Sequence, residues 1–209
     1  MHMSKREYPS FIIDKERFKL RQLNEKEAYE FLKWYVDHMD ERIAILKDFI
    51  ENDPEMEDKI NLDYSAESLI PLNKWLARQI IKESKGLQWM KERFNEKDWL
   101  VHQLIINGNI FTNEIIKISV DIAYYWAKVF LVNYPKLYWG IITSKQLPEY
   151  ALPNMPGLFG FDDEEFFQPC HMTHIVILKI LDNPNEYYLY DTYKYWEENY
   201  INNNKESIK

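Results

Sequence analysis

Residues 112–135 have the sequence TNEIIKISVDIAYYWAKVFLVNYP, the most hydrophobic helical segment of the chain. Apolar side chains recur in it at helical spacing, at Ile115, Ile118, Ile122, Trp126, Val129 and Phe130. Thr112 can cap the start of this helix, and Asn133-Tyr134-Pro135 can end it, because proline disfavours a helical conformation in the residue before it. Most sides of the helix are apolar, so we predict that it is the central helix of a mainly α protein.

A strong helix signal also stands near the start of the chain. Asn24, with Glu27 three residues later, is typical of a capping box, here with Asn in place of Ser or Thr. The apolar residues that follow are spaced alternately by four and three, at Leu32, Val36, Met39, Ile43, Leu46 and Ile50. This spacing predicts one continuous helix, which Asn52-Asp53-Pro54 is expected to end.

The next helix is predicted to begin either with Ser65 as its cap or nearer Ser68. The choice depends on Pro71, because proline is tolerated in the first turn of a helix. In the second turn it removes an intrahelical hydrogen bond, and we would then expect a kink. Residues 87–107 predict one or two shorter helices before the central one.

The periodicity changes after the central helix. Residues 137–143 favour a β-strand, and residues 147–161, which contain prolines and glycines, predict an irregular loop that includes a second short strand. A helix is then predicted from Pro169, which suits a first helical turn, to Leu181. The last helix is expected from Asn185 to near Tyr200.

These elements predict a mainly α fold with a single helical domain over residues 1–209. We expect about six or seven helices and a small β element near residues 137–161. Residues 1–10 and 202–209 are expected to be poorly ordered, because they are polar chain ends.

The composition excludes several classes of protein. The 209 residues include 26 Lys and Arg and 34 Asp and Glu, which gives a formal net charge of −8 at pH 7. This acidic balance disfavours nucleic-acid binding, which needs clustered positive charge, and is compatible with a basic protein partner. The single cysteine, Cys170, excludes an intramolecular disulfide. The sequence has no membrane-spanning run of about 18 apolar residues and no signal-peptide pattern, so we expect no membrane association and a cytoplasmic location.

Two segments together resemble a known group of proteins. The first is Asp63–Leu72, with the sequence DYSAESLIPL, and the second is Asn133–Gly140, with the sequence NYPKLYWG. With the helix that starts at Pro169, they resemble a loose group of uncharacterised bacterial cytoplasmic proteins over residues 29–196. The group has no known activity, so the resemblance implies no catalytic residues. By analogy, some small acidic proteins of this kind are immunity partners of secreted toxins.

The best candidate for a metal site is Cys170 with His171 and His174. On a helix that starts near Pro169, Cys170 and His174 lie four residues apart on one face and could supply two zinc ligands. An acidic residue from 162–164 could add a third. We favour a structural role, with Cys170 as a small buried side chain, because closed zinc sites need four ligands. We therefore predict no metal and no other cofactor.

No motif of a nucleophilic, nucleotide-binding or metal-dependent enzyme occurs in the sequence, and we predict no catalytic residues. Asp121 differs from the other carboxylates because it lies inside the hydrophobic helix, where a buried carboxylate must be paired or protonated. Lys117 and Lys128 are the nearest cations in the sequence, and Lys117 is four residues earlier on the same helix. We favour a salt bridge or a solvent-facing position over a functional acid.

The loop from Phe159 to Phe167 combines aromatic with acidic residues. The candidate binding residues are Asp162, Asp163, Glu164, Glu165, Phe166 and Phe167. Aromatic side chains anchor many protein interfaces, and acidic ones attract a basic partner. The alternative is a solvated turn whose phenylalanines pack into the core.

The sequence therefore favours a non-enzymatic protein-binding module, and a specific form of it is an immunity or inhibitor partner of a basic toxin. A second hypothesis is an enzyme or small-ligand binder with a pocket between the central helix and the β element. The candidate residues of that pocket are Asp121, Tyr125, Tyr138, His171 and His174. A third is self-association through aromatic residues of the last helix, and we expect a monomer or a simple homodimer.

Overall fold

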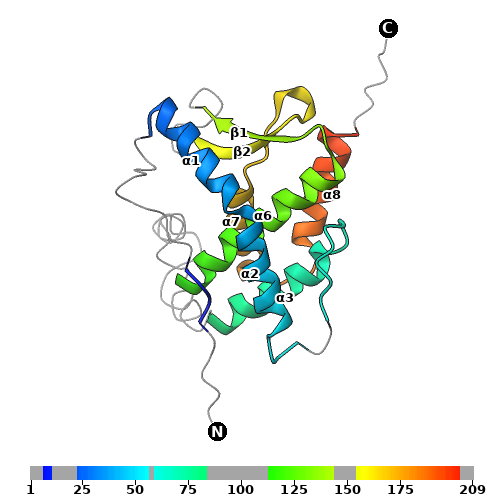
Figure 1. The fold of residues 1–209 in the computed structure, drawn as a ribbon. Coiled ribbons are helices and arrows are strands. Elements are labelled where there is room, and N and C mark those ends of the chain that lie inside the picture. Colours follow the sequence, from blue (N-terminus) through cyan, green and yellow to red (C-terminus); the bar gives the residue numbers. More distant parts are fainter. Residues whose placement is uncertain (1–6, 11–22, 57–58, 84–112, 144–153, 203–209) are drawn as a thin grey trace, which may run out of the picture.

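The computed structural model describes residues 7–10, 23–56, 59–83, 113–143 and 154–202 (Figure 1). As the sequence predicts, the fold is mainly helical with a small two-stranded antiparallel sheet. The helices predicted over residues 87–107, and the cap Thr112, lie outside the described residues. No helix in the described part is both long enough and apolar enough to cross a bilayer.

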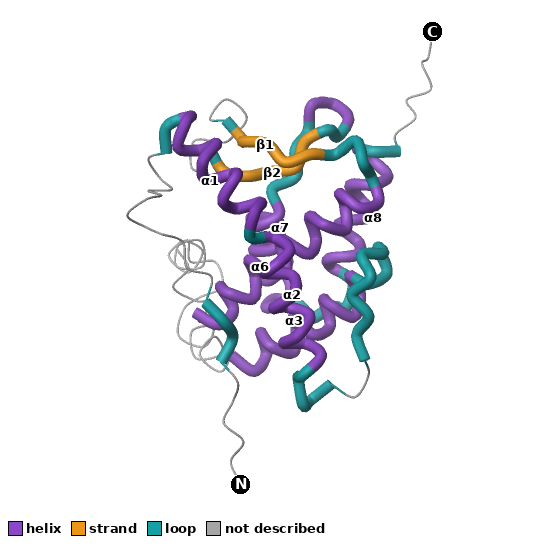
Figure 2. Tube along the Cα trace, viewed as in Figure 1, coloured by secondary structure: helices purple, strands orange, loops and turns teal. Residues whose placement is uncertain are grey.

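The elements follow each other in a simple order. The helices are α1 (Glu25–Asp37), α2 (Met39–Glu51), α3 (Leu69–Glu83), α6 (Asn113–Asn133), α7 (Pro169–Asp182) and α8 (Tyr188–Tyr200). The strands are β1 (Tyr138–Ile142) and β2 (Met155–Phe159), and a short 3-10 helix, η2 (Asp162–Glu164), follows β2. Figure 2 shows the two strands together at one end of the helical body, next to α1.

Helix α6 is the central helix, as predicted. Figure 1 shows it running through the middle of the molecule, and α2, α3 and α7 all pack against it. Every side chain from Ile122 to Ala127 is buried, and so are Val129 and Phe130. A helix that is apolar on most sides needs neighbours on most sides, so the arrangement follows from the composition of this segment.

The prediction of one continuous helix from residue 24 to residue 50 is wrong. The capping box is present, because Asn24 Oδ1 accepts from the Glu27 N–H and the Glu27 carboxylate accepts from the Asn24 N–H. The helix nevertheless ends at Asp37, and a second one begins at Met39. The apolar spacing continues across the junction, so it does not reveal the break.

The break has its cause at His38. Its backbone N–H donates to the carbonyl oxygen of Val36, as in a tightened turn. Its ring Nδ1 lies 2.7 Å from the carbonyl oxygen of Trp34 and must donate to it, because a carbonyl only accepts. The ring thus bonds to the Trp34 carbonyl oxygen, which in a regular α-helix would accept from the His38 backbone N–H. Such local side-chain bonds compete with the helical pattern.

Helix α3 begins at Leu69, so the later of the two predicted starts is confirmed. Pro71 consequently lies in the first turn, where its missing N–H costs no intrahelical bond. The turn before the helix is held by two serines. The Ser68 N–H donates to Ser65 Oγ at 3.2 Å, and Ser68 Oγ donates to the Ser65 carbonyl at 2.6 Å.

The predicted β element is an antiparallel pair. Tyr138 lies opposite Phe159 at one end, and Ile142 lies opposite Met155 at the other. After β2 the chain turns back, and Leu158 and Phe167 exchange two backbone hydrogen bonds of 2.7 and 2.9 Å. Because α7 starts two residues after Phe167, this bridge fixes the start of α7 beside the sheet.

The turn after β2 requires glycine at position 160. Gly160 has a φ of +96°, which side-chain-bearing residues rarely adopt. A Cβ atom there would lie 2.5 Å from the carbonyl oxygen of Lys136. The close approach of the two backbones brings η2 next to the segment that leads into β1.

Residues 7–10 do not fit the expectation of a poorly ordered chain end. Tyr8 is only 1% exposed, and the segment lies beside the first part of α6 (Figure 1). Its contacts with Arg42 and Asp121 are made over a sequence distance that no local pattern reveals.

Candidate functional site

The outer face of the sheet carries a row of three aromatic rings, here called the aromatic ladder: Tyr138, Phe159 and Phe166. The rings of Tyr138 and Phe159 are 6.1 Å apart and inclined by 25°, and those of Phe159 and Phe166 are 6.0 Å apart and inclined by 30°. Tyr138 is 59% exposed, while the two phenylalanines are half-buried. The ladder therefore offers accessible aromatic surface on a fixed backbone.

A glycine allows the ladder to lie flat on the sheet. A Cβ atom at Gly140 would be 2.7 Å from Cδ2 of Phe159, so the ring of Phe159 covers the position where a side chain would stand. Phe159 faces Tyr138 across the strands, and the pairing sets the distance between their rings. Local sequence and strand register thus both position the ladder.

The acidic residues of the predicted loop lie directly before Phe166. Glu164 and Glu165 are exposed, and Glu164 has a φ of 59°, in the left-handed region. Asp162 lies 3.1 Å from Lys136 Nζ, so part of its charge is compensated locally. The side chain of Asp163 lies outside the described residues. Two carboxylates therefore stand in water beside the ladder.

Phe167 is a correction to the predicted set of binding residues, because it is fully buried. Its ring packs against Trp126, Phe130 and Trp196, at centroid distances of 5.1, 4.9 and 5.2 Å. Phe161 is also part of the core. For these two phenylalanines the alternative, that they pack into the core, is confirmed. Phe166 is half-buried instead, and its ring lies beside that of Phe159 on the sheet.

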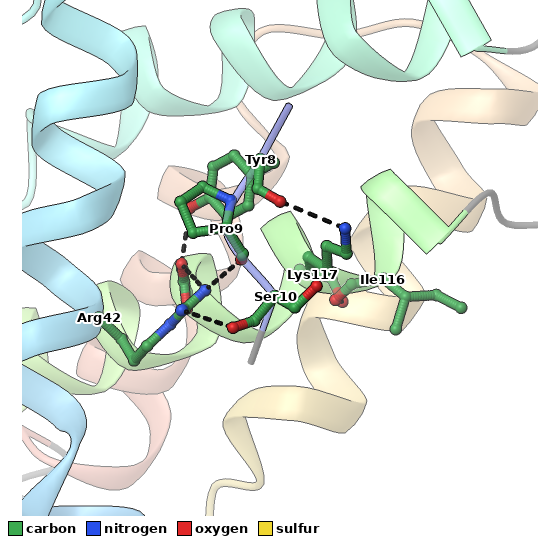
Figure 3. A network of polar contacts seen from close by, with 8 residues as sticks. Tyr8, Pro9, Ser10, Arg42, Ile116 and Lys117 are labelled. Atoms are coloured by element: carbon green, nitrogen blue, oxygen red, sulfur yellow. Dashed lines mark hydrogen bonds and ion pairs between the residues drawn. The ribbon is translucent and has the colours of Figure 1, made fainter. Parts of the chain in front are cut away.

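A second polar feature lies inside the molecule, where α2 and α6 meet. Asp121 is completely buried, and both of its oxygens are engaged by Arg42: Nε donates to Oδ1 and Nη2 to Oδ2, each at 2.8 Å. The hydroxyl of Tyr8 donates to Oδ2 at 2.6 Å. Figure 3 shows Arg42 reaching toward the segment of Tyr8. The carboxylate is thus paired and hydrogen-bonded, as a buried charge must be.

This geometry corrects the predicted partner of Asp121. Lys117 Nζ donates to the carbonyl oxygen of Tyr8 at 3.2 Å, and the ion pair of Asp121 is with Arg42. The solvent-facing alternative is also wrong. The sequence does hold a signal for Arg42, because it follows Met39 by three residues and precedes Leu46 by four, on the buried face of its helix.

The ionisation of this cluster is governed by its burial. Desolvation raises the pKa of the Asp121 carboxyl above its ordinary value, although the hydrogen bonds from Arg42 and Tyr8 act in the opposite direction. Desolvation, with the nearby Asp121 charge, also raises the pKa of the Tyr8 phenol well above its usual value. Tyr8 therefore keeps its proton and donates it to the Asp121 carboxylate.

The residues of the metal hypothesis face different environments. Cys170 Sγ lies 3.2 Å from the hydroxyl of Tyr35, and burial raises the pKa of its thiol, which disfavours the thiolate that metals bind. His171 and His174 are exposed on α7, although partial desolvation lowers the pKa of both imidazoles. No group of three or more potential ligands occurs among the described residues.

The residues of the pocket hypothesis also lie in several different environments. The hydroxyl of Tyr125 lies 2.6 Å from Ser68 Oγ and accepts from the Tyr64 N–H at 3.1 Å. Asp121 is directed to Arg42, and Tyr138 belongs to the exposed ladder. His171 and His174 lie on the exposed side of α7. Asp121, Tyr125 and Tyr138 thus lie in three different environments, whereas the His171 imidazole is close enough to help lower the pKa of His174.

Comparisons of the chain with family models, with curated proteins and with solved structures find no match. The resemblance of the segments Asp63–Leu72 and Asn133–Gly140 to a bacterial group accordingly stays a prediction. In the fold these two segments do meet, because Asn133 Nδ2 donates to the carbonyl oxygen of Tyr64 at 2.9 Å. Function must be inferred from the site itself.

Proposed function

We propose that the protein is a non-enzymatic binding module that recognises a basic protein through the aromatic ladder and the adjacent Glu164 and Glu165. The observation that supports this most is an exposed tyrosine in a fixed row of rings, flanked by two exposed carboxylates. The net charge of −8 also favours a basic partner, because it attracts positively charged proteins.

The two parts of this surface have different physical roles. Aromatic side chains bring a large contact area with few rotatable bonds, and tyrosine is enriched among residues that dominate binding energy. Exposed carboxylates steer an oppositely charged partner during encounter and exclude acidic proteins. Because the ladder stands on paired strands and Gly140, little ordering is needed when a partner binds.

The specific form of the proposal is an immunity or inhibitor protein whose partner is a basic toxin. Such a partner needs a positively charged surface that the module can cover, and the acidic balance of the chain suits that task. Two residues of the pocket hypothesis, Tyr125 and Asp121, are hydrogen-bonded to Ser68 and Arg42, and this supports the exposed surface as the binding part.

The test compares two charge-reversal variants with the unmodified protein. The surface variant is Glu164→Lys with Glu165→Lys. The matched control is Glu51→Lys with Asp182→Lys, which changes the charge equally at two exposed helix ends where lysine suits the helix dipole. Each is used to capture proteins from the native host, and retained proteins are identified by mass spectrometry. The partner is then purified and its affinity for each variant is measured by calorimetry.

We expect a basic protein that binds the unmodified chain and the control equally, and the surface variant about tenfold or more weakly. Tyr138→Ala should weaken binding further, because it removes the exposed end of the ladder. Equal affinity of the purified partner for the surface variant and the control would contradict the proposal, as would the absence of any protein that distinguishes them. If the partner is a toxin, the unmodified chain should also suppress its activity in a growth assay.

A further inference from the structure

The segment Glu7–Ser10 lies between α2 and α6, and charged side chains of both helices bind its backbone. On the α6 side, the Tyr8 N–H donates to Glu114 Oε1 at 2.9 Å, and the Tyr8 carbonyl oxygen accepts from Lys117 Nζ at 3.2 Å. Figure 3 shows the segment passing between Lys117 on one side and Arg42 on the other.

On the α2 side, one guanidinium binds the next two carbonyl groups. Arg42 Nη2 donates to the Pro9 carbonyl oxygen at 3.1 Å, and Nη1 donates to that of Ser10 at 3.3 Å. The same guanidinium holds Asp121 through Nε and Nη2. Arg42 therefore binds the backbone of the segment and the buried Asp121 carboxylate at the same time.

The side chain of Tyr8 fills the space between the helices. Its ring centroid is 4.6 Å from that of Phe49 on α2, at an interplanar angle of 60°, and its hydroxyl reaches Asp121 Oδ2. At 1% exposure it is as buried as the residues of the central helix. The site thus has an apolar wall for the ring and an acceptor for the hydroxyl.

We infer that Arg42, Asp121, Glu114 and Lys117 form a binding site for a Tyr-Pro peptide, which the chain's own residues 7–10 occupy. This group of residues is called the Tyr-Pro site below. In folded proteins about two-thirds of hydrogen bonds join backbone to backbone. Here the Tyr8 N–H and the carbonyl groups of Tyr8, Pro9 and Ser10 bond to charged side chains instead, as in a groove that holds an extended peptide through its side chains. A separate peptide with the same sequence can make these bonds, and the covalent link gives the internal copy a high effective concentration at the site.

The chemistry of the site defines its ligand. Asp121 is a carboxylate whose oxygens only accept, so it requires the hydroxyl of tyrosine and gives phenylalanine no partner. A proline after the tyrosine presents a carbonyl without an N–H, and the site supplies a donor for that carbonyl. A phosphorylated tyrosine would place its negative charge against Asp121 and is excluded.

The test uses the full-length variant Tyr8→Ala and a fluorescein-labelled peptide of sequence Glu-Tyr-Pro-Ser, capped at both ends. We expect the variant to bind the peptide, and the unmodified chain to bind it about tenfold or more weakly, because its own segment competes for the site. Fluorescence anisotropy gives both affinities, and circular dichroism shows whether the variant is folded.

Two control peptides define the specificity. Replacing tyrosine by phenylalanine should weaken binding to Tyr8→Ala about tenfold, because a hydrogen bond to a charged group is lost. The phosphotyrosine peptide should not bind. A folded Tyr8→Ala variant that binds none of the peptides, or that binds the tyrosine and phenylalanine peptides equally, would overturn the inference.

Hydrogen exchange of the unmodified chain tests the inference even if the variant does not fold. If residues 7–10 are an exchangeable ligand, the Tyr8 amide should exchange about tenfold or more faster than amides in the middle of α6, through a local opening. An excess of the Glu-Tyr-Pro-Ser peptide should accelerate it further. Exchange of the Tyr8 amide together with α6, with the same dependence on denaturant, would show that the segment is an inseparable part of the core.

Discussion

Arg42 and Asp121 are both buried, so the contribution of this pair to stability depends on desolvation as much as on attraction. Removing two charges from water is costly, and their mutual attraction recovers the cost only with good geometry and further hydrogen bonds. Both conditions hold here, because two guanidinium nitrogens each lie 2.8 Å from a carboxylate oxygen and the Tyr8 hydroxyl adds a third bond.

The first prediction is that breaking this pair destabilises the protein strongly. Asp121→Asn leaves the Arg42 guanidinium buried without its counter-ion, and the free energy of unfolding should fall by about 3–5 kcal/mol. The double variant Arg42→Met with Asp121→Leu removes both charges and should recover much of the loss. Urea unfolding followed by circular dichroism measures both changes.

An exposed ion pair serves as the control for this prediction. Lys33 and Asp37 form a pair on the surface of α1, and Asp37→Asn should cost less than about 1 kcal/mol. The interpretation of the buried pair would be wrong if Asp121→Asn were as mild as Asp37→Asn, or if the double variant were less stable than Asp121→Asn.

At the scale of elements, helix boundaries and strand register position the proposed binding surface. The ladder exists because β1 and β2 pair with Tyr138 opposite Phe159, and because residue 140 has no side chain. If one strand slipped by one residue relative to the other, its ring would turn to the opposite face and the row would be broken. The backbone bridge between Leu158 and Phe167 then brings Phe166 to the end of the row.

The second prediction concerns Gly140→Ala. Its Cβ atom would stand 2.7 Å from Cδ2 of Phe159, so the ring must move, and we expect a loss of about 1–3 kcal/mol in the free energy of unfolding. In a Phe159→Ala background the same substitution should cost less, since the obstructing ring is absent. A double-mutant cycle by urea unfolding measures the coupling, and additive effects of the two substitutions would contradict it.

At the scale of the whole molecule, the net charge of −8 produces electrostatic repulsion that affects the stability of the entire fold. The excess acidic groups repel one another across the surface of the folded protein. At about 0.1 M, dissolved salt largely screens the interaction between exposed charges that are more than about 10 Å apart. The exposed ion pairs contribute little and are screened as well. The buried Arg42–Asp121 pair is shielded from this screening by its surroundings.

The third prediction follows from this balance. At pH 7 the midpoint of thermal unfolding should rise as sodium chloride is added, because screening reduces repulsion among the excess acidic groups. Near the isoelectric point of 5.2 the net charge vanishes, and the same addition of salt should have a much smaller effect. Differential scanning calorimetry at both pH values tests this, and a midpoint that falls with salt at pH 7 would contradict it.

The local pattern of the chain was sufficient to predict several features. The apolar spacing around Ile122 predicts the central helix, Pro169 marks a helix start, and the change of period after Pro135 predicts the strands. The acidic run from Asp162 to Glu165 beside Phe166 can also be read directly from the sequence. These properties are encoded by residues close together in the sequence, and side-chain periodicity reports them directly.

Other features depended on contacts between distant residues. Arg42, the partner of Asp121, lies 79 residues away in the sequence, and Tyr8 reaches the same carboxylate over 113 residues. Phe166 and Phe167 are adjacent in the sequence, but only the packing of the core decides that Phe167 is the buried one. The sequence by itself determined which segments are helical, which are extended and where acidic charge stands beside aromatic residues. The tertiary structure alone decided which charged groups meet and which rings stay at the surface, because packing brings together side chains that no periodicity relates.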